Sequence, residues 1–308
     1  MKIVMLDRNT LGDDLDISIF EELGEFTCYD AAPPHVSKEY IKDADVIIFN
    51  KTIINEELLK DAPNVKLLCI TGTGFDNVDI EYINSRNIVL KNVVDYSTAS
   101  VVQHTFALAL FIIEKLSHYD EFVKSEKYCE QSGFSNFGEK FFEISGKTWG
   151  IVGMGNIGRG VAKIATAFGA NVIYYSSTGK NNSQDYKKVE WEELLENSDI
   201  ISVHCPLTNA TREIFNKEAF EKMKKSAFFI NVARGGVVNE EDLYNALCND
   251  EISAAGLDVL SKEPMQMSNP LRKIKDGRKL IVTPHMGWAS TEARNRCMQE
   301  VYKNIREF

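Results

Sequence analysis

The sequence predicts an α/β protein of two domains, each built on a doubly wound parallel sheet. Its 308 residues are too many for one typical hydrophobic core, so two domains are expected. Short apolar runs alternate with amphipathic stretches along most of the chain. This strand–helix alternation is typical of parallel sheets that helices cover on both faces.

Each short apolar run is predicted to be a buried strand, because its length and composition suit a strand covered on both sides. The amphipathic stretches at 190–198 and 239–250 are predicted to be helices that pack on these strands. The predicted strands are 2–6, 46–49, 66–71, 88–92, 148–153, 171–176, 199–204, 227–232, 254–259 and 280–285.

A long apolar segment marks the border between the domains. It starts near Thr98, runs to about His118, and is predicted to be one helix that is buried or connects two domains. The irregular segment 125–147 is interpreted as a loop or arm between helices. We therefore expect a discontinuous outer domain, 1–98 plus 286–308, and an inner domain, 99–285.

Composition excludes several classes of partner. The formal net charge is -10, with acidic and basic residues interspersed, whereas nucleic-acid binding needs a basic surface. No apolar run is long enough to span a membrane, and the first residues, MKIVMLDRNT, do not form a signal peptide. We expect a cytoplasmic protein with reduced thiols and no metal, because no cysteine pair has metal-ligand spacing: Cys28, Cys69, Cys129, Cys205, Cys248 and Cys297.

A glycine motif predicts a dinucleotide site. It follows the strand at 148–153 and opens a helical pattern. The first glycine permits a tight turn, the second lets the backbone approach a pyrophosphate, and the third allows close helix–strand packing. Free N–H groups at the helix start would bind the phosphates. The motif residues are Gly153, Met154, Gly155, Asn156, Ile157 and Gly158.

The end of the next strand bears on the choice between NAD and NADP. An acidic residue expected there, to hold the adenosine ribose, is replaced by Ser176, and Ser177 and Lys180 follow. A carboxylate would repel the extra phosphate of NADP, whereas hydroxyls and a lysine would accept it. In the alternative interpretation, Ser176 binds the ribose of NAD through its hydroxyl. The sequence leaves both cofactors open.

Three candidate catalytic residues follow three later strands. Arg234 lies after the strand 227–232, Glu263 after 254–259, and His285 at the end of 280–285. Parallel α/β sheets bind their ligands at such strand ends. Each residue alone also has an ordinary structural interpretation, as an ion pair, a loop start or a turn. An arginine, a carboxylate and a histidine at such strand ends can work together in one site.

The chain resembles the D-isomer-specific 2-hydroxyacid dehydrogenase family over nearly its whole length. The resemblance rests on five segments that occur in the same order as in the family: GMGNIG, VHCPLTNATREIF, FFINVARGGVVNEEDL, AAGLDVLSKEP and TPHMGWAS. The stretches YSTASVVQHTFAL and TPHMGWASTEAR look most like the glycerate dehydrogenase (hydroxypyruvate reductase) branch. The resemblance implies a Rossmann-type NAD(P)-binding domain over 99–285 and a flavodoxin-like substrate domain. It implies hydride transfer between NAD or NADP and a small D-2-hydroxy or 2-keto acid.

The resemblance also implies roles for the candidate residues. Arg234 would bind the substrate carboxylate and polarise the adjacent carbonyl. His285 would take the hydroxyl proton during oxidation and return it during reduction. Glu263 would orient the imidazole and favour its charged form. Asp258 would accept a hydrogen bond from the nicotinamide amide or help to fix its ring.

Several further residues are expected to bind substrate, to line the cofactor cleft or to be structural. The backbone of Gly72, Thr73 and Gly74 would bind the substrate carboxylate, although a glycine turn is the alternative. Trp288 would wall the pocket or simply pack. His104 is expected to be structural. Four residues are expected to line the cofactor cleft: His204, Pro206, Thr211 and Ala233.

One departure and two rival functions stay open. The interval from Glu263 to His285 carries a basic insertion that we expect to loop out without moving the two residues. The buried face of the inner domain and the arm at 118–147 are expected to form a symmetric dimer, as in the family. One rival is a non-catalytic NAD(H) sensor with protein partners. The other is a dehydrogenase of a different small anion, such as formate or phosphite, because Arg234 binds anions generally.

Overall fold

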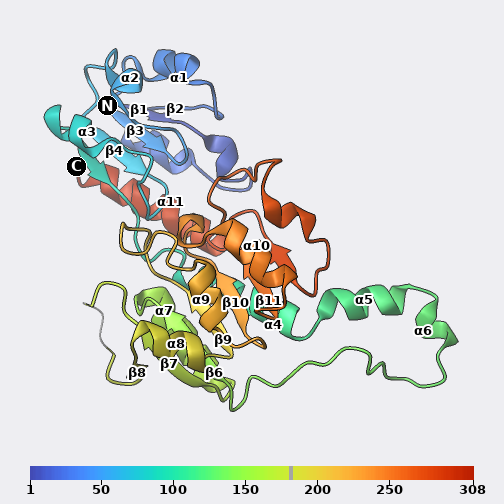
Figure 1. The fold of residues 1–308 in the computed structure, drawn as a ribbon. Helices are drawn as coiled ribbons and strands as arrows, with labels where there is room; N and C mark the ends of the chain where they lie inside the picture. Colours follow the sequence, from blue (N-terminus) through green and yellow to red (C-terminus); the bar gives the residue numbers. More distant parts are fainter. Residues whose placement is uncertain (180–182) are drawn as a thin grey trace. The chain divides into compact units, whose positions relative to one another are not determined.

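The computed structural model describes residues 1–179 and 183–308 and contains two compact units (Figure 1). Unit 1 comprises Met1–Ser97 and Trp288–Phe308, so both termini belong to it. Unit 2 comprises Thr98–Gly287. The predicted fold class is confirmed, since both units contain parallel sheets with helices.

Unit 1 forms a five-stranded parallel sheet in the order β2-β1-β3-β4-β5 in the described chain. Successive residues of the central strands alternate between two hydrophobic clusters on opposite faces, as strand geometry requires. The strands are β1 (Lys2–Met5), β2 (Glu25–Cys28), β3 (Val46–Phe49), β4 (Leu67–Ile70) and β5 (Val89–Lys91). Its helices are η1 (Arg8–Thr10), η2 (Ser18–Leu23), α1 (Pro34–Ile41), α2 (Glu56–Leu59), α3 (Ile80–Ser85) and α11 (Thr291–Arg306).

Unit 2 forms a seven-stranded parallel sheet within the described residues, in the order β12-β11-β10-β9-β6-β7-β8. The strands are β6 (Thr148–Val152), β7 (Asn171–Tyr175), β8 (Lys187–Lys188), β9 (Ile200–Val203), β10 (Phe228–Asn231), β11 (Ala254–Leu257) and β12 (Leu280–Val282). Its helices are α4 (Thr98–Ile113), α5 (Leu116–Lys124), α6 (Lys127–Glu130), α7 (Asn156–Ala167), α8 (Trp191–Asn197), α9 (Lys217–Lys222), η3 (Gly235–Val237), α10 (Glu240–Cys248) and η4 (Pro270–Lys273).

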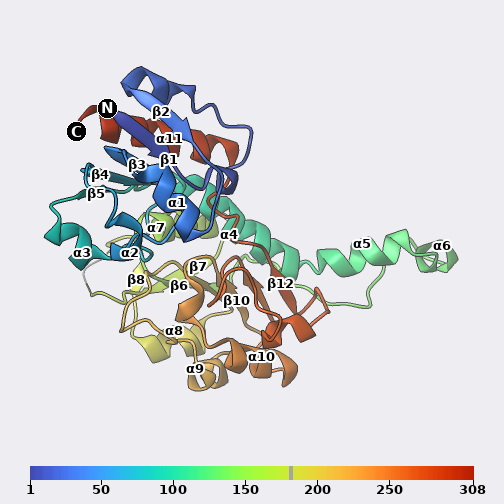
Figure 2. The ribbon, with the colours of Figure 1, turned by 90° about the horizontal axis from the view of Figure 1, so that it is seen from above.

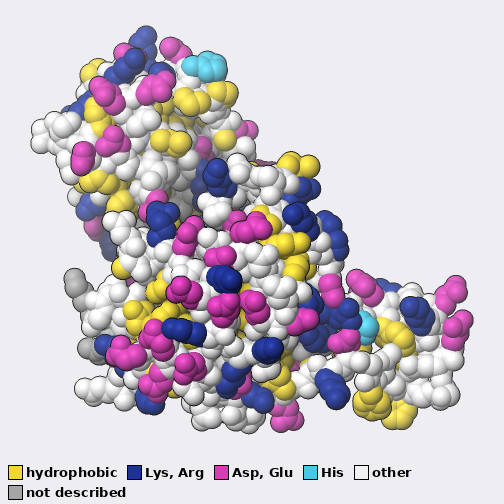
Figure 3. Space-filling view, in the orientation of Figure 1, with side chains coloured by type: hydrophobic (Ala, Val, Ile, Leu, Met, Phe, Trp, Pro, Cys, Tyr) yellow, Lys and Arg dark blue, Asp and Glu magenta, His cyan; other side chains and the backbone are white. Residues whose placement is uncertain are grey.

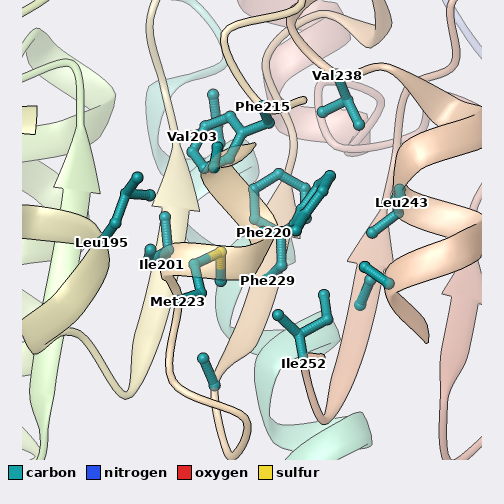
Figure 4. Packing of buried hydrophobic residues seen from close by; sticks show 14 of the residues in the cluster. Leu195, Ile201, Val203, Phe215, Phe220, Met223, Phe229, Val238, Leu243 and Ile252 are labelled. Atoms are coloured by element: carbon teal, nitrogen blue, oxygen red, sulfur yellow. The ribbon is translucent and has the colours of Figure 1, made fainter. Parts of the chain in front are cut away.

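Two hydrophobic clusters hold the sheet of unit 2 between its helix layers. One cluster joins the sheet to α4 and α7, and the other joins it to α8, α9 and α10. Figure 4 shows the second cluster, where Phe215, Phe220 and Phe229 meet. The rings of Phe215 and Phe229 lie 4.6 Å apart between centroids. This packing fixes the positions of β9 and β10, whose ends carry site residues.

The sequence did not predict two edge strands. β2 mixes polar and apolar residues and is only partly buried, so it lacks the continuous apolar run of a central strand. β8 is two exposed lysines. Edge strands pair on one side only and carry weaker hydrophobic signals, which explains both omissions.

The helix predicted from Thr98 to about His118 is in fact two helices. α4 ends at Ile113, and α5 follows after a bend of 58°. Lys115, between them, has a φ of 56°, and a left-handed residue cannot continue a right-handed helix. The ammonium of Lys115 lies 5.5 Å from the centre of the Phe228 ring, a contact that no local sequence pattern encodes.

Within the described residues, no single helix is both long and apolar enough to cross a membrane. The bent pair α4 and α5 meets the criteria of length and composition taken together. Eight residues of α4 are buried in the core of unit 2, which accounts for its apolar composition.

The segment predicted as a loop or arm at 125–147 contains one short helix, α6. Figures 1 and 2 show α5, α6 and the returning chain extending away from the sheet of unit 2. α5 has no buried residue. Residues 116–143 are called the arm below.

Candidate active site

The carboxyl ends of neighbouring strands line up along one edge of the unit 2 sheet. The strand register places six residues in one row: Tyr175, Val152, Val203, Asn231, Leu257 and Val282. The next residue on each strand is Ser176, Gly153, His204, Val232, Asp258 and Thr283, respectively. Most of the residues that the sequence singled out in unit 2 therefore stand on or just beyond this edge, where α/β sheets bind ligands.

The strand order reverses at β6. β6 is the first strand of unit 2, and its neighbours are β7 on one side and β9 on the other. The crevice at such a switch point is the usual ligand site of open α/β sheets. Gly153 lies at this point against the next loop, since a Cβ on Gly153 would lie 2.7 Å from the Cys205 nitrogen.

The glycine loop has the conformation that dinucleotide binding needs. Gly153 has a φ of 97°, which favours glycine in this turn. A Cβ at Gly158 would lie 2.1 Å from the Gly153 carbonyl oxygen, so only glycine allows helix α7 to pack this closely. A Cβ at Gly155 would meet nothing within 4 Å. The space in front of Gly155 is therefore open to a ligand.

The start of α7 completes a phosphate-binding arrangement. α7 begins at Asn156, its N-cap is Gly155, and no side chain caps it. The helix dipole favours an anion at this end of α7. Ile157 packs against the core of unit 2 and fixes the helix in place. These residues fit the pyrophosphate of a dinucleotide.

Ser176, the first of the residues predicted to bind the ribose, lies directly after β7. Ser176 is 7% exposed, and its carbonyl accepts a hydrogen bond from Gly179, which closes a turn. Ser177 is partly exposed beside it. Lys180, the third residue predicted here, lies outside the described residues.

His204 is partly buried beside the glycine loop and stays neutral. Its Nε2 lies 2.9 Å from the Ser202 hydroxyl, and burial lowers the pKa of His204 to about 3. Ser202 also accepts a hydrogen bond of 2.9 Å from the Trp149 indole. A histidine that is neutral near pH 7 cannot supply a proton as imidazolium.

The other predicted cleft residues divide into exposed and buried groups. Pro206, which follows β9, is exposed. Ala233, which follows β10, is partly exposed. Thr211 is buried, and its hydroxyl donates to the Pro206 carbonyl at 2.7 Å. Thr211 therefore shapes the loop that carries Pro206.

The two candidate proton-transfer residues are in direct contact. His285 Nδ1 lies 2.7 Å from Glu263 Oε2. Glu263 Oε1 accepts a second hydrogen bond, 2.9 Å long, from the Leu260 N–H. The side chains are 26% and 33% exposed, so the pair is reachable from solvent. Because Nδ1–H donates to the carboxylate, Nε2 is the nitrogen that gains and loses the exchangeable proton.

Arg234 stands in a turn built against the loop that leads to Glu263. Asn231 organises this turn, since its amide donates to the Arg234 carbonyl at 3.0 Å and its oxygen accepts from the Ala233 N–H. Arg234 Nη1 donates to the Ala233 carbonyl at 2.9 Å. A Cβ on Gly235 would lie 1.9 Å from the Leu260 carbonyl carbon, so glycine is required for this contact. Gly235 was not among the residues that the sequence pattern assigned to the site.

Asp258 is buried beneath the turn that carries His285. It is 2% exposed, and its carboxylate accepts hydrogen bonds from the Thr283 hydroxyl and from the backbone of Met286 and Gly287. The family resemblance implied that this carboxylate binds or fixes the nicotinamide. The structure shows it engaged with the turn at 283–287.

The lysine- and arginine-rich insertion between Glu263 and His285 is held against the rest of unit 2. Leu271 is 1% exposed in the core, and Asn269 donates a hydrogen bond of 2.8 Å to Glu240. Arg278 pairs with Asp276 and Glu139, and the Asp276 hydrogen bond raises the pKa of Arg278. The contact between Glu263 and His285 is intact beside it.

The remaining predicted residues belong to unit 1. Gly72, Thr73 and Gly74 follow β4, and this turn is held by two bonds to Val93: its N–H donates to the Gly72 carbonyl, and its carbonyl accepts from the Thr73 hydroxyl. A Cβ at Gly72 would meet nothing within 4 Å. Trp288 packs on the unit 1 core, edge-on to Tyr96 at 6.5 Å. Across the described chain, no group of three or more His, Cys, Asp or Glu could hold a metal ion.

The fold and this edge of the sheet define a dehydrogenase that uses a nicotinamide dinucleotide. A doubly wound parallel sheet carries a glycine loop at the start of a helix, and a hydrogen-bonded pair of His285 and Glu263 follows its later strands. The chain belongs to the D-isomer specific 2-hydroxyacid dehydrogenases, because the family's NAD binding domain matches residues 106–287. It is an NAD(P)-dependent oxidoreductase that acts on 2-hydroxy acids and 2-keto acids.

Individual relatives agree with this assignment over the full chain. The hydroxypyruvate reductase of Blautia hydrogenotrophica is 38% identical and covers 100% of this chain and 97% of its own. The glycerate dehydrogenase of Methylorubrum extorquens is 32% identical and covers 100% and 96%. An acyclic imino acid reductase, solved in complex with NADPH and D-arginine, is 30% identical with a TM-score of 0.87, and the alignment covers 100% of this chain and 96% of that one.

Proposed function

We propose that this enzyme reduces small 2-keto acids, hydroxypyruvate foremost, to D-2-hydroxy acids, with Arg234, Glu263 and His285 as its catalytic residues. The observation that carries the proposal is the 2.7 Å contact between His285 Nδ1 and Glu263 Oε2, beside the arginine turn. Support for hydroxypyruvate comes from two relatives of matching length, which are named for hydroxypyruvate reduction and glycerate oxidation.

The three catalytic residues have different tasks in this proposal. The nicotinamide supplies or accepts the hydride when the cofactor is bound. Arg234 binds the substrate carboxylate through its planar fork and polarises the neighbouring carbonyl. His285 gives its Nε2 proton to the carbonyl oxygen during reduction and takes it back during oxidation. Glu263 keeps Nε2 in position and stabilises the protonated ring.

The residues that hold the cofactor and the substrate follow from the same proposal. Gly153, Gly155, Gly158 and the N–H groups of Asn156 and Ile157 bind the pyrophosphate. Ser176, Ser177 and Lys180 receive the ribose, and His204, Pro206, Thr211 and Ala233 form or shape the cleft. The backbone of Gly72, Thr73 and Gly74, with Trp288, contributes to the substrate site. Units 1 and 2 then serve as the substrate domain and the NAD(P)-binding domain.

A substrate panel tests this function. Purified enzyme is mixed with NADH or NADPH and with hydroxypyruvate, glyoxylate, pyruvate or a bulkier 2-keto acid, and cofactor oxidation is followed. We expect turnover with at least one small 2-keto acid and a D-configured product. Tight cofactor binding without turnover would favour an NAD(H) sensor. Reduction of NAD by formate or phosphite alone would favour the other-anion dehydrogenase.

Position 176 is expected to govern the choice of cofactor. Because Ser176 replaces an acidic ribose ligand, wild type should accept NADPH. Ser176→Asp should raise kcat/KM for NADH relative to kcat/KM for NADPH. The expected change in this preference is roughly 1–3 kcal/mol, the typical strength of one charge-assisted hydrogen bond. Ser176→Ala is the matched control, since it removes the hydroxyl without adding charge. The idea fails if wild type ignores NADPH and the aspartate leaves the ratio unchanged.

We also propose that the enzyme is a homodimer formed through the arm. α5 buries none of its residues, and Phe134, Phe137 and Phe141 are 90%, 88% and 55% exposed. Figure 3 shows hydrophobic side chains on the surface of this arm. An exposed apolar surface of this kind is typical of an interaction site, and a closed pair is the commonest assembly of identical chains.

Sedimentation velocity tests the dimer. Wild type should sediment as a dimer at micromolar concentration, and Phe134→Asp with Phe137→Asp should shift it toward monomer, because buried unpaired charge disfavours an interface. The exposed Met267, also apolar but outside the arm, gives the control variant Met267→Asp. A monomeric wild type would refute the proposed assembly.

A cytoplasmic location completes the proposal. All six cysteines are free thiols, and Cys69, Cys205 and Cys297 are buried. Burial raises the pKa of each of these three thiols to about 12, which keeps them protonated and unreactive. Reduced cysteines are the usual state in the cytosol.

A further inference from the structure

Asp258 ties together the turn that carries His285. Its Oδ1 accepts from the Thr283 hydroxyl at 2.6 Å and from the Met286 N–H at 2.8 Å, and its Oδ2 accepts from the Gly287 N–H at 2.7 Å. Its backbone carbonyl accepts from the His285 N–H at 2.8 Å. Burial raises the pKa of Asp258, but hydrogen bonds led by His104 outweigh burial and hold the pKa below its usual value. The carboxylate is therefore charged at neutral pH.

A second histidine reaches this network from helix α4. His104 Nε2 lies 2.9 Å from the Thr283 hydroxyl oxygen and 3.2 Å from Asp258 Oδ1. The Thr283 hydroxyl gives its only proton to Asp258 over the shorter distance of 2.6 Å. Its oxygen must then accept from His104. The network thus assigns a proton to Nε2 of His104.

Helix α4 binds both ends of the turn. The Ser100 hydroxyl donates to the Gly287 carbonyl at 2.6 Å, four residues before His104 binds at Thr283. Residues four apart lie on the same face of a helix. Gly287 lies close to both partners, because a Cβ there would be 2.9 Å from Asp258 Oδ2 and 3.5 Å from His104 Cδ2. One face of α4 therefore clamps the segment 283–287.

The contacts of α4 with the segment 283–287 matter because His285 has an unfavourable backbone conformation. Its φ is 56°, a left-handed conformation that residues other than glycine rarely adopt. Such a conformation persists only where the surroundings impose it. Here the hydrogen bonds on both sides of His285 impose it, and their shared acceptor Asp258, together with Thr283, also receives the Nε2–H of His104.

We propose that His104 is a positioning residue of the enzyme: its Nε2–H, shared by Thr283 and Asp258, holds the turn at 283–287 so that His285 meets Glu263. This inference rests on the proposed function. His104 itself carries no proton to or from the substrate. It acts through the Thr283–Asp258 pair on the placement of His285.

The test compares His104→Leu with His104→Gln. Leucine fills similar space without a donor, whereas the glutamine amide keeps an N–H donor. His104→Leu should lower kcat for keto-acid reduction by about tenfold to a hundredfold, the cost of misplacing a catalytic group, with little change in cofactor Kd. His104→Gln should recover most of this loss. The matched control is Gln103→Leu, at an exposed position of the same helix.

The pH profile separates positioning from a general loss of folded enzyme. A displaced His285 loses part of its stabilising interaction with Glu263. As pH rises, the rate of reduction should therefore begin to decline at a lower pH in His104→Leu than in wild type. A smaller folded fraction would scale the whole profile without moving it. A profile that is only scaled, an unchanged kcat, or equal losses in the leucine and glutamine variants would overturn the proposal.

Hydrogen exchange tests the clamp without turnover. The N–H groups of His285, Met286 and Gly287 all donate to Asp258, so the peptide that contains them should exchange faster in His104→Leu and not in Gln103→Leu. Unchanged exchange would refute the clamp even in an active enzyme. A wild type that is inactive on every 2-keto acid would instead refute the proposed function, and the exchange rates would still decide whether His104 holds the turn.

Discussion

Replacement of His285 with alanine is expected to lower kcat for keto-acid reduction by about 10²–10⁴, the usual contribution of a placed acid or base. The reason is that His285 is the only described histidine in contact with Glu263, at 2.7 Å. Cofactor Kd, measured by NADH fluorescence, should stay within about twofold, since proton transfer and phosphate binding use different groups. The glycine loop that binds the phosphates follows β6, whereas His285 follows β12.

The control for this prediction is His35→Ala, which removes an exposed histidine of unit 1. If His285→Ala kept a near-normal kcat, another group would have to carry the proton. His204 is a poor substitute, because burial lowers its pKa to about 3 and leaves it neutral. His104 is committed to Thr283 and Asp258.

Arg234→Lys is expected to raise KM for the keto acid and lower kcat together. Lysine keeps the positive charge but loses the planar fork that binds a carboxylate through two bonds. The lost bond to a charged group is worth about 1.5–3 kcal/mol, which corresponds to about a tenfold to a hundredfold loss in kcat/KM. Steady-state kinetics with hydroxypyruvate and saturating NADH measure both constants.

The exposed Arg306 on α11 offers the same substitution outside the site, so Arg306→Lys is the matched control. A change in KM alone would mean that Arg234 binds substrate without polarising its carbonyl. Normal kinetics in Arg234→Lys would remove Arg234 from the catalytic set.

Much of the fold could be predicted because central parallel strands are continuous apolar runs. The predicted runs 46–49 and 254–259 contain β3 and β11, for example. The omitted strands β2 and β8 lie at sheet edges, where burial is one-sided. The break at Lys115 could not be predicted, because it involves contact with Phe228, far away in the sequence.

The candidate site likewise has features that local sequence patterns predict and features that depend on contacts between distant segments. Glycine spacing after a strand predicts the loop at Gly153, since the signal is local. The contact of Gly235 with Leu260 and the bonds of Asp258 to the 283–287 turn join segments distant in sequence. Only the folded chain reveals that Asp258 serves the turn and that His104 supports it.

In the proposed mechanism, one proton carrier, His285 held by Glu263, serves both directions of the reaction. The most direct test measures kcat against pH for reduction and for oxidation, in wild type and in Glu263→Gln. Reduction needs protonated His285 and should fall as pH rises, whereas oxidation needs the neutral ring and should rise. Glutamine keeps the shape of Glu263 but removes the charge that stabilises the protonated ring. Both profiles should therefore move to lower pH in the variant. Profiles that stay in place, or that move in opposite directions, would contradict the assignment of His285 and Glu263 as the proton-transfer pair.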